Sequence, residues 1–357
     1  MCKEVDYPII PSRRRTPVSN SRYLLGMAVA SIFSLAYLLV PAYIISAIFA
    51  LVMRYPDTQS SLAYALPMLF SLLFPPKSSR FALWMARPML DYFVFESLHL
   101  SDDVDETETE TCESMSESSD DEGNMRSGKE ESSGGEEKSS RKRRGRILAA
   151  QPHGVLTYVA MCEAITNPES AERIPTAVAS ILLRTPILRN LMGIFNLVDA
   201  SGPSLKRHLG ADGGSVLLYV GGIAELFKSC RNEERLYLKE RKGFIKLALT
   251  CNVDVVPVYL FGNTSVLSVL RRGPLAGLSR RLGASLTLFW GKYYLPIPRD
   301  EKLLYVVGRP IGLPHIAHPT QEDIDRWHRV YCDEVRDIYE TYKERVPTYK
   351  RKVLYID

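Results

Sequence analysis

The side chain best suited to proton transfer is the imidazole of His153, in the sequence Gln151-Pro-His-Gly154. Histidine changes its charge near neutral pH and can therefore act as a general base. Pro152 cannot donate to a sheet ladder, and Gly154 leaves room for a substrate or another backbone to approach closely. We therefore expect His153 on a turn at the end of a strand, where α/β proteins place their sites. The alternative is a structural histidine whose hydrogen bonds are satisfied within the turn.

A second group of residues, Gly221-Gly-Ile-Ala-Glu225, also follows a predicted strand. The glycines Gly221 and Gly222 free the backbone for a turn, and Glu225 places a carboxylate at the mouth of the sheet. A Gly-Gly turn beside a glutamate is common, so this group alone does not define a site.

Three cations, Arg241, Lys242 and Lys246, cluster at the start of a predicted helix. Positive charge at that end opposes the helix dipole, and a bound anion would help to explain it. The alternative is a basic turn that is simply solvated.

Strand and helix patterns alternate from Ile147 to about Val346, which predicts an α/β domain with a largely parallel sheet. The predicted strands are residues 146–150, 215–220, 253–261, 286–290 and 303–307. The predicted helices are residues 155–161, residues 243–250 and a C-terminal helix that begins after Thr320. Asp323, three residues after that N-cap, makes an imperfect capping box.

The N-terminal part of the chain is apolar enough for a membrane. Residues 23–53 carry no charge, and as one helix they would span about 46 Å against about 30 Å of hydrocarbon. A second apolar stretch covers residues 62–76. Two arrangements fit: a long tilted span with a short second span, or a re-entrant hairpin bent at Pro41. The basic flanks on both sides predict that everything after about residue 77 is cytosolic. A buried soluble helix pair and a cleaved signal peptide are the alternatives.

Residues 101–140 hold 15 acidic side chains against three basic ones, in a chain whose net charge is +4. With almost no large apolar side chains, this segment predicts a disordered insert that is open to phosphorylation. The basic cluster at residues 141–146 is expected to meet anionic headgroups or to fold back on the acidic run. The cysteines and histidines lack metal-ligand or redox spacing, which predicts reduced thiols and no metal site.

In their order along the chain, these groups resemble the type 2 diacylglycerol acyltransferase family, which includes monoacylglycerol and wax-alcohol acyltransferases. The hallmark of that family is His-Pro-His-Gly, seen here as Gln151-Pro-His-Gly154. The resemblance covers about residues 147–343, and the apolar pair before them matches the membrane hairpin of the family. The other matching segments are 186–193, 198–201, 213–214, 219–225, 241–248, 256–262, 307–311 and the helix around His328 and Tyr331.

The chain departs from the family pattern at three places. Gln151 replaces the first histidine of the hallmark, which leaves His153 as the base. Asn263 stands where the family usually has glutamate, so any role of that glutamate is in doubt here. The acidic insert is also unusual. The wider glycerolipid acyltransferases use His-x4-Asp, but Tyr158 stands at the aspartate position, and Glu163 would lie about 15 Å away along a continuous helix.

The resemblance implies a membrane-bound, acyl-CoA-dependent diacylglycerol O-acyltransferase that makes triacylglycerol. His153 would deprotonate the acceptor hydroxyl, and Glu225 would orient and charge-stabilise the imidazole. Backbone amides near the motif glycines would stabilise the oxyanion, and the three cations would bind the CoA phosphates. The motif or oxyanion residues are Pro152, Gly154, Gly221 and Gly222, and the phosphate-binding residues are Arg241, Lys242 and Lys246.

Other acceptors are a monoacylglycerol, a long-chain alcohol (which would give a wax ester) or a sterol. A non-enzymatic lipid-droplet or membrane scaffold would be expected to lack the motif histidine. A soluble nucleotide-binding enzyme would be expected to have a Gly-x-Gly-x-x-Gly motif or a Walker loop, and the sequence contains neither. We expect no cofactor besides acyl-CoA as co-substrate and no nucleic-acid partner, and a homo-oligomer is left open.

The resemblance implies that the protein lies in the endoplasmic reticulum membrane, with its catalytic domain in the cytosol and the lipid droplet as a further location. The expected fold is an N-terminal membrane helix pair or hairpin followed by a mostly parallel sheet domain of the glycerolipid acyltransferase type. The predicted segments are a polar tail (1–21), a membrane-embedded hairpin (22–76), a juxtamembrane segment (77–100), the acidic insert with its basic cluster (101–146) and the catalytic domain (147–357).

Overall fold

The computed structural model of the chain describes residues 18–100, 144–210, 214–226, 228, 233–270 and 288–357. The predictions for the acidic run and for residues 141–143 of the basic cluster lie outside these residues. So does the first part of the strand predicted at 286–290, of which Phe289–Trp290 forms β9.

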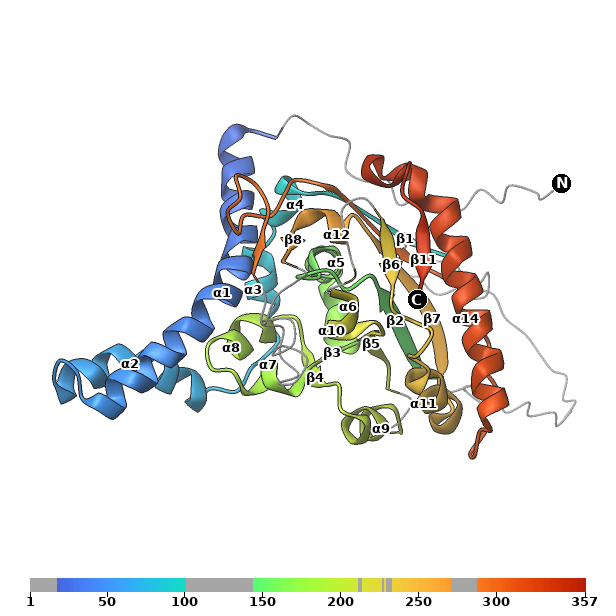
Figure 1. Cartoon of the computed structure of the whole chain (residues 1–357), viewed down its shortest axis with the longest axis horizontal. Helices are drawn as coiled ribbons and strands as arrows, with labels where there is room; N and C mark the ends of the chain where they lie inside the picture. Colours follow the sequence, from blue (N-terminus) through green and yellow to red (C-terminus); the bar gives the residue numbers. More distant parts are fainter. Residues whose placement is uncertain (1–17, 101–143, 211–213, 227, 229–232, 271–287) are drawn as a thin grey trace, which may run out of the picture. The chain divides into compact units, whose positions relative to one another are not determined.

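A seven-stranded sheet, in the order β1-β10-β7-β2-β5-β3-β4, forms the framework of the described part (Figure 1). β10 is antiparallel to β7, and the other neighbours are parallel. The prediction of an α/β fold with a mostly parallel sheet is therefore confirmed. The strands are β1 (Val94–His99), β2 (Arg146–Gln151), β3 (Thr176–Val178), β4 (Leu197–Asp199), β5 (Val216–Tyr219), β7 (Asp254–Phe261) and β10 (Lys302–Val307).

Short elements complete the described residues. Two small sheets pair β6 (Glu234–Leu236) with β11 (Leu354–Ile356) and β8 (Ser268–Val269) with β9. Besides α1, α2 and α14, described below, the helices are α3 (Arg80–Met85), α4 (Met89–Tyr92), α5 (Tyr158–Thr166), α6 (Pro168–Arg173), α7 (Ser180–Arg184), α8 (Leu188–Gly193), α9 (Gly202–Gly210), α10 (Gly222–Leu226), α11 (Gly243–Cys251) and α12 (Asn263–Val266), with 3-10 turns at Lys343–Arg345 and Pro347–Tyr349.

β7 lies near the middle of the sheet, and all eight of its residues are buried. Its side chains alternate between two hydrophobic clusters, as a strand covered on both faces requires. Tyr259 and Phe261 join the cluster formed with α9, α11 and α14, whereas Val258 and Leu260 join the cluster formed with α1, α4 and α5. The site elements described below therefore have a packed layer on each face of the sheet.

The C-terminal helix α14 (Gln321–Tyr342) begins as the sequence predicts. Thr320 and Asp323 form a capping box in which each side chain accepts the backbone N–H of the other residue. The apolar stripe is buried at Ile324, Tyr331 and Val335. The helix predicted at residues 155–161, in contrast, begins at Tyr158, because Gly154 has a φ of 62° and the chain bends before the helix starts.

α1 (Asn20–Met53) is a single helix that continues through Pro41. Among the described residues it is the one helix long and apolar enough to cross a membrane. Its first half is part of the sheet domain: Ala30 and Phe33 are buried in the cluster with α4 and α5, and the Tyr158 hydroxyl donates to the Ala30 carbonyl at 2.8 Å. Gly26 allows this close packing, because a Cβ there would lie 2.2 Å from the Pro88 carbonyl oxygen.

The second half of α1 leaves the domain and packs against α2 (Thr58–Leu73) (Figure 1). The Tyr43 hydroxyl donates to the Tyr64 carbonyl at 2.7 Å, and Ala47 contacts the α2 residues Ala65 and Met68. The segment after α2 contains an element that was not predicted, because β1 joins the edge of the main sheet beside β10. The segment predicted as juxtamembrane, residues 77–100, thus also contributes a strand to the main sheet.

Candidate functional site

His153 lies on the loop that follows β2, and its imidazole is held in one orientation. Nδ1 lies 2.8 Å from the Gly154 carbonyl oxygen. A carbonyl oxygen can only accept, so Nδ1 carries the proton and Nε2 keeps its lone pair. Burial lowers the pKa of the His153 imidazole below its usual value, although the bond to Gly154 opposes this shift. The ring is therefore neutral near pH 7, and Nε2 can accept a proton.

A cavity of about 840 Å³ opens beside this imidazole. Most of its lining side chains are apolar, and among its lining residues His153 and Arg184 carry the groups that can be charged near neutral pH. It extends to Pro41 and Ile44 of α1, on the half of the helix that leaves the sheet domain. The cavity can therefore hold a long apolar chain between α1 and His153. Its lining residues include Tyr37, Leu38, Pro41, Ile44, Ile45, Leu156, Ala160, Met161, Ala164, Ile181, Leu182, Leu188, Phe195, Leu218, Tyr219 and Leu226.

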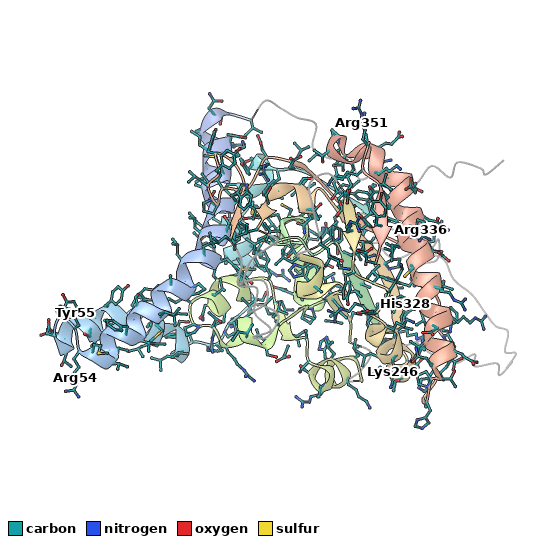
Figure 2. The ribbon with its side chains drawn as sticks, viewed as in Figure 1. Arg54, Tyr55, Lys246, His328, Arg336 and Arg351 are labelled. Carbon is teal, nitrogen blue, oxygen red and sulfur yellow. The ribbon has the colours of Figure 1, made fainter. Side chains whose placement is uncertain are left out.

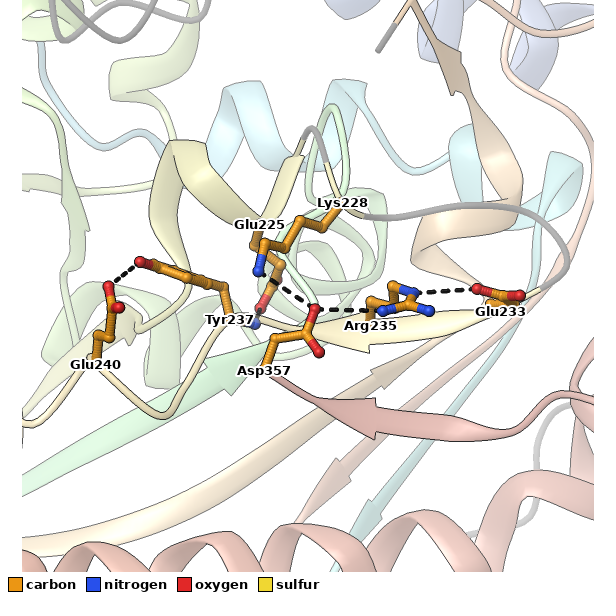
Figure 3. Close-up of polar contacts among 7 residues, drawn as sticks. All are labelled: Glu225, Lys228, Glu233, Arg235, Tyr237, Glu240 and Asp357. Carbon is orange, nitrogen blue, oxygen red and sulfur yellow. Dashed lines mark hydrogen bonds and ion pairs between the residues drawn. The ribbon is translucent and has the colours of Figure 1, made fainter. Parts of the chain in front are cut away.

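Glu225 is fully buried and holds the main chain of His153. Its Oε1 accepts the backbone N–H of His153 at 2.6 Å. Its Oε2 accepts the backbone N–H of Tyr237 at 3.3 Å, and Figure 3 shows this second contact. Gly221 makes room for this carboxylate, because a Cβ there would lie 2.1 Å from Oε2. Burial raises the pKa of Glu225 to about 7, while the two N–H donors lower it.

The expected contact of Glu225 with the imidazole therefore needs correction. The contact that joins the two residues is to the backbone amide of His153, and the imidazole Nδ1 bonds to the Gly154 carbonyl instead. The strand end delivers Glu225 beside His153 as predicted. The turn at Gly154 directs the His153 ring toward the Gly154 carbonyl. The spacing of residues in the sequence does not reveal this orientation.

Asn263 supports the loop of His153, a role that the sequence pattern does not predict. It is buried directly after β7, and its Nδ2 donates to the carbonyls of Pro152 at 3.1 Å and of His153 at 2.6 Å. Gly154 permits this approach, because a Cβ there would lie 2.8 Å from Nδ2. The next residue, Thr264, bonds to the buried Lys352 at 3.4 Å, which holds α12 in place.

The loop of His153 is thus held from both sides by the ends of neighbouring strands. Glu225 comes from the carboxyl end of β5, and Asn263 comes from that of β7, with β2 between them. Carboxyl ends of parallel strands meet at one edge of a sheet, where α/β proteins bind ligands. The position of Asn263, directly after the predicted strand 253–261, is the signal that could have revealed it.

Gln151 lies on the other side of the motif from the cavity. Its side chain is fully buried, and its Oε1 accepts the Tyr331 hydroxyl of α14 at 3.0 Å. Gln151 is not among the residues that line the cavity, whereas His153 is. The first residue of the motif therefore contacts α14, which explains why an amide can stand in place of an imidazole there.

Tyr158 and Glu163, the two positions considered for a His-x4-Asp partner, both have other contacts. The Tyr158 hydroxyl donates to the Ala30 carbonyl in α1. The Glu163 carboxylate accepts from Asn167 at 2.6 Å and lies 3.2 Å from the His99 ring. Tyr158, which stands at the aspartate position of the His-x4-Asp motif, therefore connects α5 to α1.

The predicted phosphate-binding cations do not line the cavity. The Lys242 ammonium pairs with Asp325 of α14 at 2.7 Å. The Arg241 guanidinium lies 5.1 Å from the ring centroid of Tyr237, and its charge helps to lower the pKa of Glu225. Lys246 is exposed on α11, at the opposite end of the view from the α1–α2 tip marked by Arg54 and Tyr55 (Figure 2). The structure thus connects Arg241 to the site through Tyr237 but does not bring Lys242 and Lys246 to the cavity.

The four predicted motif or oxyanion residues divide into two groups. Gly222 lines the cavity beside His153, and a Cβ there would meet nothing within 4 Å. Pro152, Gly154 and Gly221 belong to the support of the loop: the first two supply carbonyl acceptors, and the third makes room for Glu225.

Comparisons with known proteins show the family of the chain. A family model described as "Diacylglycerol acyltransferase" matches residues 136–357, which is more than half of the chain. The chain is 30% identical over 217 residues to a "Diacylglycerol O-acyltransferase 2" of Dictyostelium discoideum, covering 55% of this chain and 66% of that protein. It is 30% identical over 222 residues to a human "2-acylglycerol O-acyltransferase 3", covering 56% and 65%.

These matches span just under two thirds of the length of the relatives. Among solved structures, the chain is similar to the 1-acyl-sn-glycerophosphate acyltransferase PlsC from Thermotoga maritima, with 11% identity, a TM-score of 0.38 and coverage of 90% of this chain and 96% of that chain. This likeness is too weak to indicate a function. The family model, in contrast, matches residues 136–357, and the chain therefore belongs to the diacylglycerol acyltransferase family.

Proposed function

We propose that this chain is a membrane-bound acyltransferase that transfers an acyl group from acyl-CoA to the free hydroxyl of diacylglycerol, giving triacylglycerol. The observation that carries the proposal is the unprotonated Nε2 of His153 beside an apolar cavity of about 840 Å³ that reaches α1. An acyl chain needs such a cavity, and a hydroxyl acceptor needs such a base.

In the proposed mechanism, Nε2 of His153 takes the proton of the acceptor hydroxyl. The oxygen attacks the thioester carbonyl of acyl-CoA, the carbon–sulfur bond breaks, and the thiolate of CoA leaves. The proton on the imidazolium then passes to the thiolate, so that the products are the ester and free CoA. The Gly154 carbonyl stabilises the imidazolium because it accepts the Nδ1 proton throughout. Arg241, Lys242 and Lys246 remain candidates for the phosphates of CoA, and Gly222 for the oxyanion.

The proposed membrane arrangement follows from the two halves of α1. The sheet domain covers one face of the first half, so the second half and the 16 residues of α2 form the part that enters the bilayer. Each arm is about 24 Å long against about 30 Å of hydrocarbon, so the long side chain of Arg54 at the tip would extend toward the opposite headgroups. The catalytic domain then faces the cytosol, on the endoplasmic reticulum or a lipid droplet, where diacylglycerol is within reach of the cavity.

The alternative is that the chain transfers the acyl group to an acceptor other than diacylglycerol. One relative is named for 2-acylglycerol, and another, 27% identical over 216 residues, is a human "Acyl-CoA wax alcohol acyltransferase 1". An apolar cavity would also accept a long-chain alcohol, so acceptor preference is decided by competition between acceptors.

The experiment is expression in a host that makes no neutral lipid, followed by lipid analysis and acceptor competition with purified membranes. The chain should produce triacylglycerol, and His153→Ala should lower turnover by about 10²–10⁴-fold, the usual effect of losing positioned proton transfer. His318→Ala, which changes an exposed histidine, is the matched control. Failure to form any ester would overturn the proposed activity, and a His153→Ala protein with most of its turnover would overturn the proposed base.

A further inference from the structure

Two tyrosines form the tip of a tight turn next to α1. The Leu295 N–H donates to the Lys292 carbonyl at 2.9 Å, which closes a turn around Tyr293 and Tyr294. Both tyrosines have positive φ, 56° and 58°. Glycine and asparagine normally occupy both central positions of such a turn, because side chains with a Cβ are strained there. The chain thus keeps two bulky rings where small residues would fold more easily.

The two rings are among the most exposed large apolar side chains of the described residues. The exposed fraction is 78% for Tyr293 and 88% for Tyr294, and Leu295 beside them is 51% exposed. The segment around them, residues 291–298, contains one charge, that of Lys292, and Lys292 already pairs with Asp300 at 2.9 Å. The strain and the exposure together indicate a binding role rather than a structural one.

The turn is fixed to α1, so the two rings lie beside that helix. The Ser34 hydroxyl of α1 donates to the Pro296 carbonyl at 2.5 Å, and the Lys292 ammonium donates to the Tyr23 hydroxyl at 2.6 Å. The segment after β9, orange in Figure 1, lies beside the first half of this helix. Along the same stretch α1 exposes Leu24 and Ile32, by 55% and 52%.

We infer that the Tyr293-Tyr294 turn is a second membrane contact, which enters the headgroup layer of the bilayer beside α1. Tyrosine has an apolar body and a polar hydroxyl, and it collects at membrane interfaces for that reason. The hydrogen bonds with Tyr23 and Ser34 hold the turn beside α1, whose second half enters the bilayer in the proposed arrangement. It would seat the sheet domain on the lipid with a fixed tilt, with the cavity facing the bilayer. This inference rests on the membrane-bound part of the proposed function.

The first test uses the native full-length chain in phosphatidylcholine vesicles and hydroxyl-radical labelling read by mass spectrometry. Tyr355 on β11, which is 42% exposed, is the internal control. If all these rings faced water, Tyr294 would be labelled faster than Tyr355. We expect the reverse, with Tyr293 and Tyr294 labelled several-fold more slowly than Tyr355. Labelling in the order of the exposed fractions would overturn the inference.

The second test identifies the lipid as the partner. Tyr294→Trp and the control Tyr355→Trp are made with Trp84, Trp290 and Trp327 changed to Phe, and both are placed in vesicles of brominated phosphatidylcholine. The lipid should quench the fluorescence of Tyr294→Trp but not that of the control. Protection in the first test without quenching in the second would assign the turn to a second protein copy and overturn the inference. Neither measurement requires acyl transfer. Quenching in a protein without acyltransferase activity would therefore contradict the proposed activity but not the membrane contact.

Discussion

Asn263→Asp tests whether the position of the His153 loop depends on the amide of Asn263. Asn263 donates to two carbonyls, those of Pro152 and His153, and a carboxylate can donate to neither. Each hydrogen bond contributes about 0.5–1.5 kcal/mol, so the loss of both should cost about 1–3 kcal/mol. If this free energy displaces the loop, turnover should fall by about 5- to 150-fold, since 1.4 kcal/mol corresponds to a factor of ten.

The loss should depend on pH, which separates positioning from general destabilisation. In the Asn263→Asp protein, a protonated carboxyl group would still donate one bond, whereas the carboxylate would repel both carbonyl oxygens, so activity should fall further as the pH rises. The assay is the initial rate of acyl transfer in mixed micelles at equal folded protein, from pH 5 to 8. Asn263→Ala should lose activity without this pH dependence. Asn252→Asp, at an exposed position, should behave like the parent. An Asn263→Asp enzyme with unchanged turnover at every pH would refute the reasoning.

Three further predictions concern Glu225, the cations and the cavity. Because burial raises the pKa of Glu225 from 4.5 to about 7, the folded protein binds a proton that the unfolded chain has lost, so stability should fall by about 3 kcal/mol as pH rises between these values. Glu225→Gln should reduce the fall of the melting temperature over this pH range. Parallel curves of melting temperature against pH for the two proteins would contradict this prediction. Changing Lys242 and Lys246 to Gln should raise the apparent KM for acyl-CoA more than for diacylglycerol, and an unchanged KM would leave them without a role in acyl-CoA binding. Ala160→Trp and Ala164→Trp, which narrow the cavity, should lower turnover with long-chain acyl-CoA more than with short-chain acyl-CoA, whereas equal losses would contradict its role as the acyl site.

The strand ends around His153 could be predicted because each strand has a strong local signal. β2, β5 and β7 are short apolar runs, and Pro152, Gly221 and Gly262 interrupt the chain where they end. The residues after each run could therefore be expected at one edge of the sheet. The roles of Glu225 and Asn263 could not be predicted, because they depend on which backbone atoms of the loop turn toward each side chain.

The position of α1 could not be predicted for a different reason. Ala30 and Phe33 have the same apolar character whether lipid or protein covers them, so hydropathy cannot distinguish the two surroundings. β1 was missed because its residues follow the apolar helices directly and pair with β10, more than 200 residues later in the chain. The strand that pairs with it is therefore remote in the sequence.

The shared role of α1 has a practical consequence for producing this chain. A fragment that starts after α2 would lack Ala30 and Phe33, and the hydroxyl of Tyr158 would lose the Ala30 carbonyl as its acceptor. The same cut would remove Pro41 and Ile44 and so open one wall of the cavity. Removing α1 and α2 thus removes part of the core and part of the cavity wall together. In the proposed membrane arrangement, the need for detergent follows from the fold, and a water-soluble version would need a redesigned surface on α1 rather than a shorter chain.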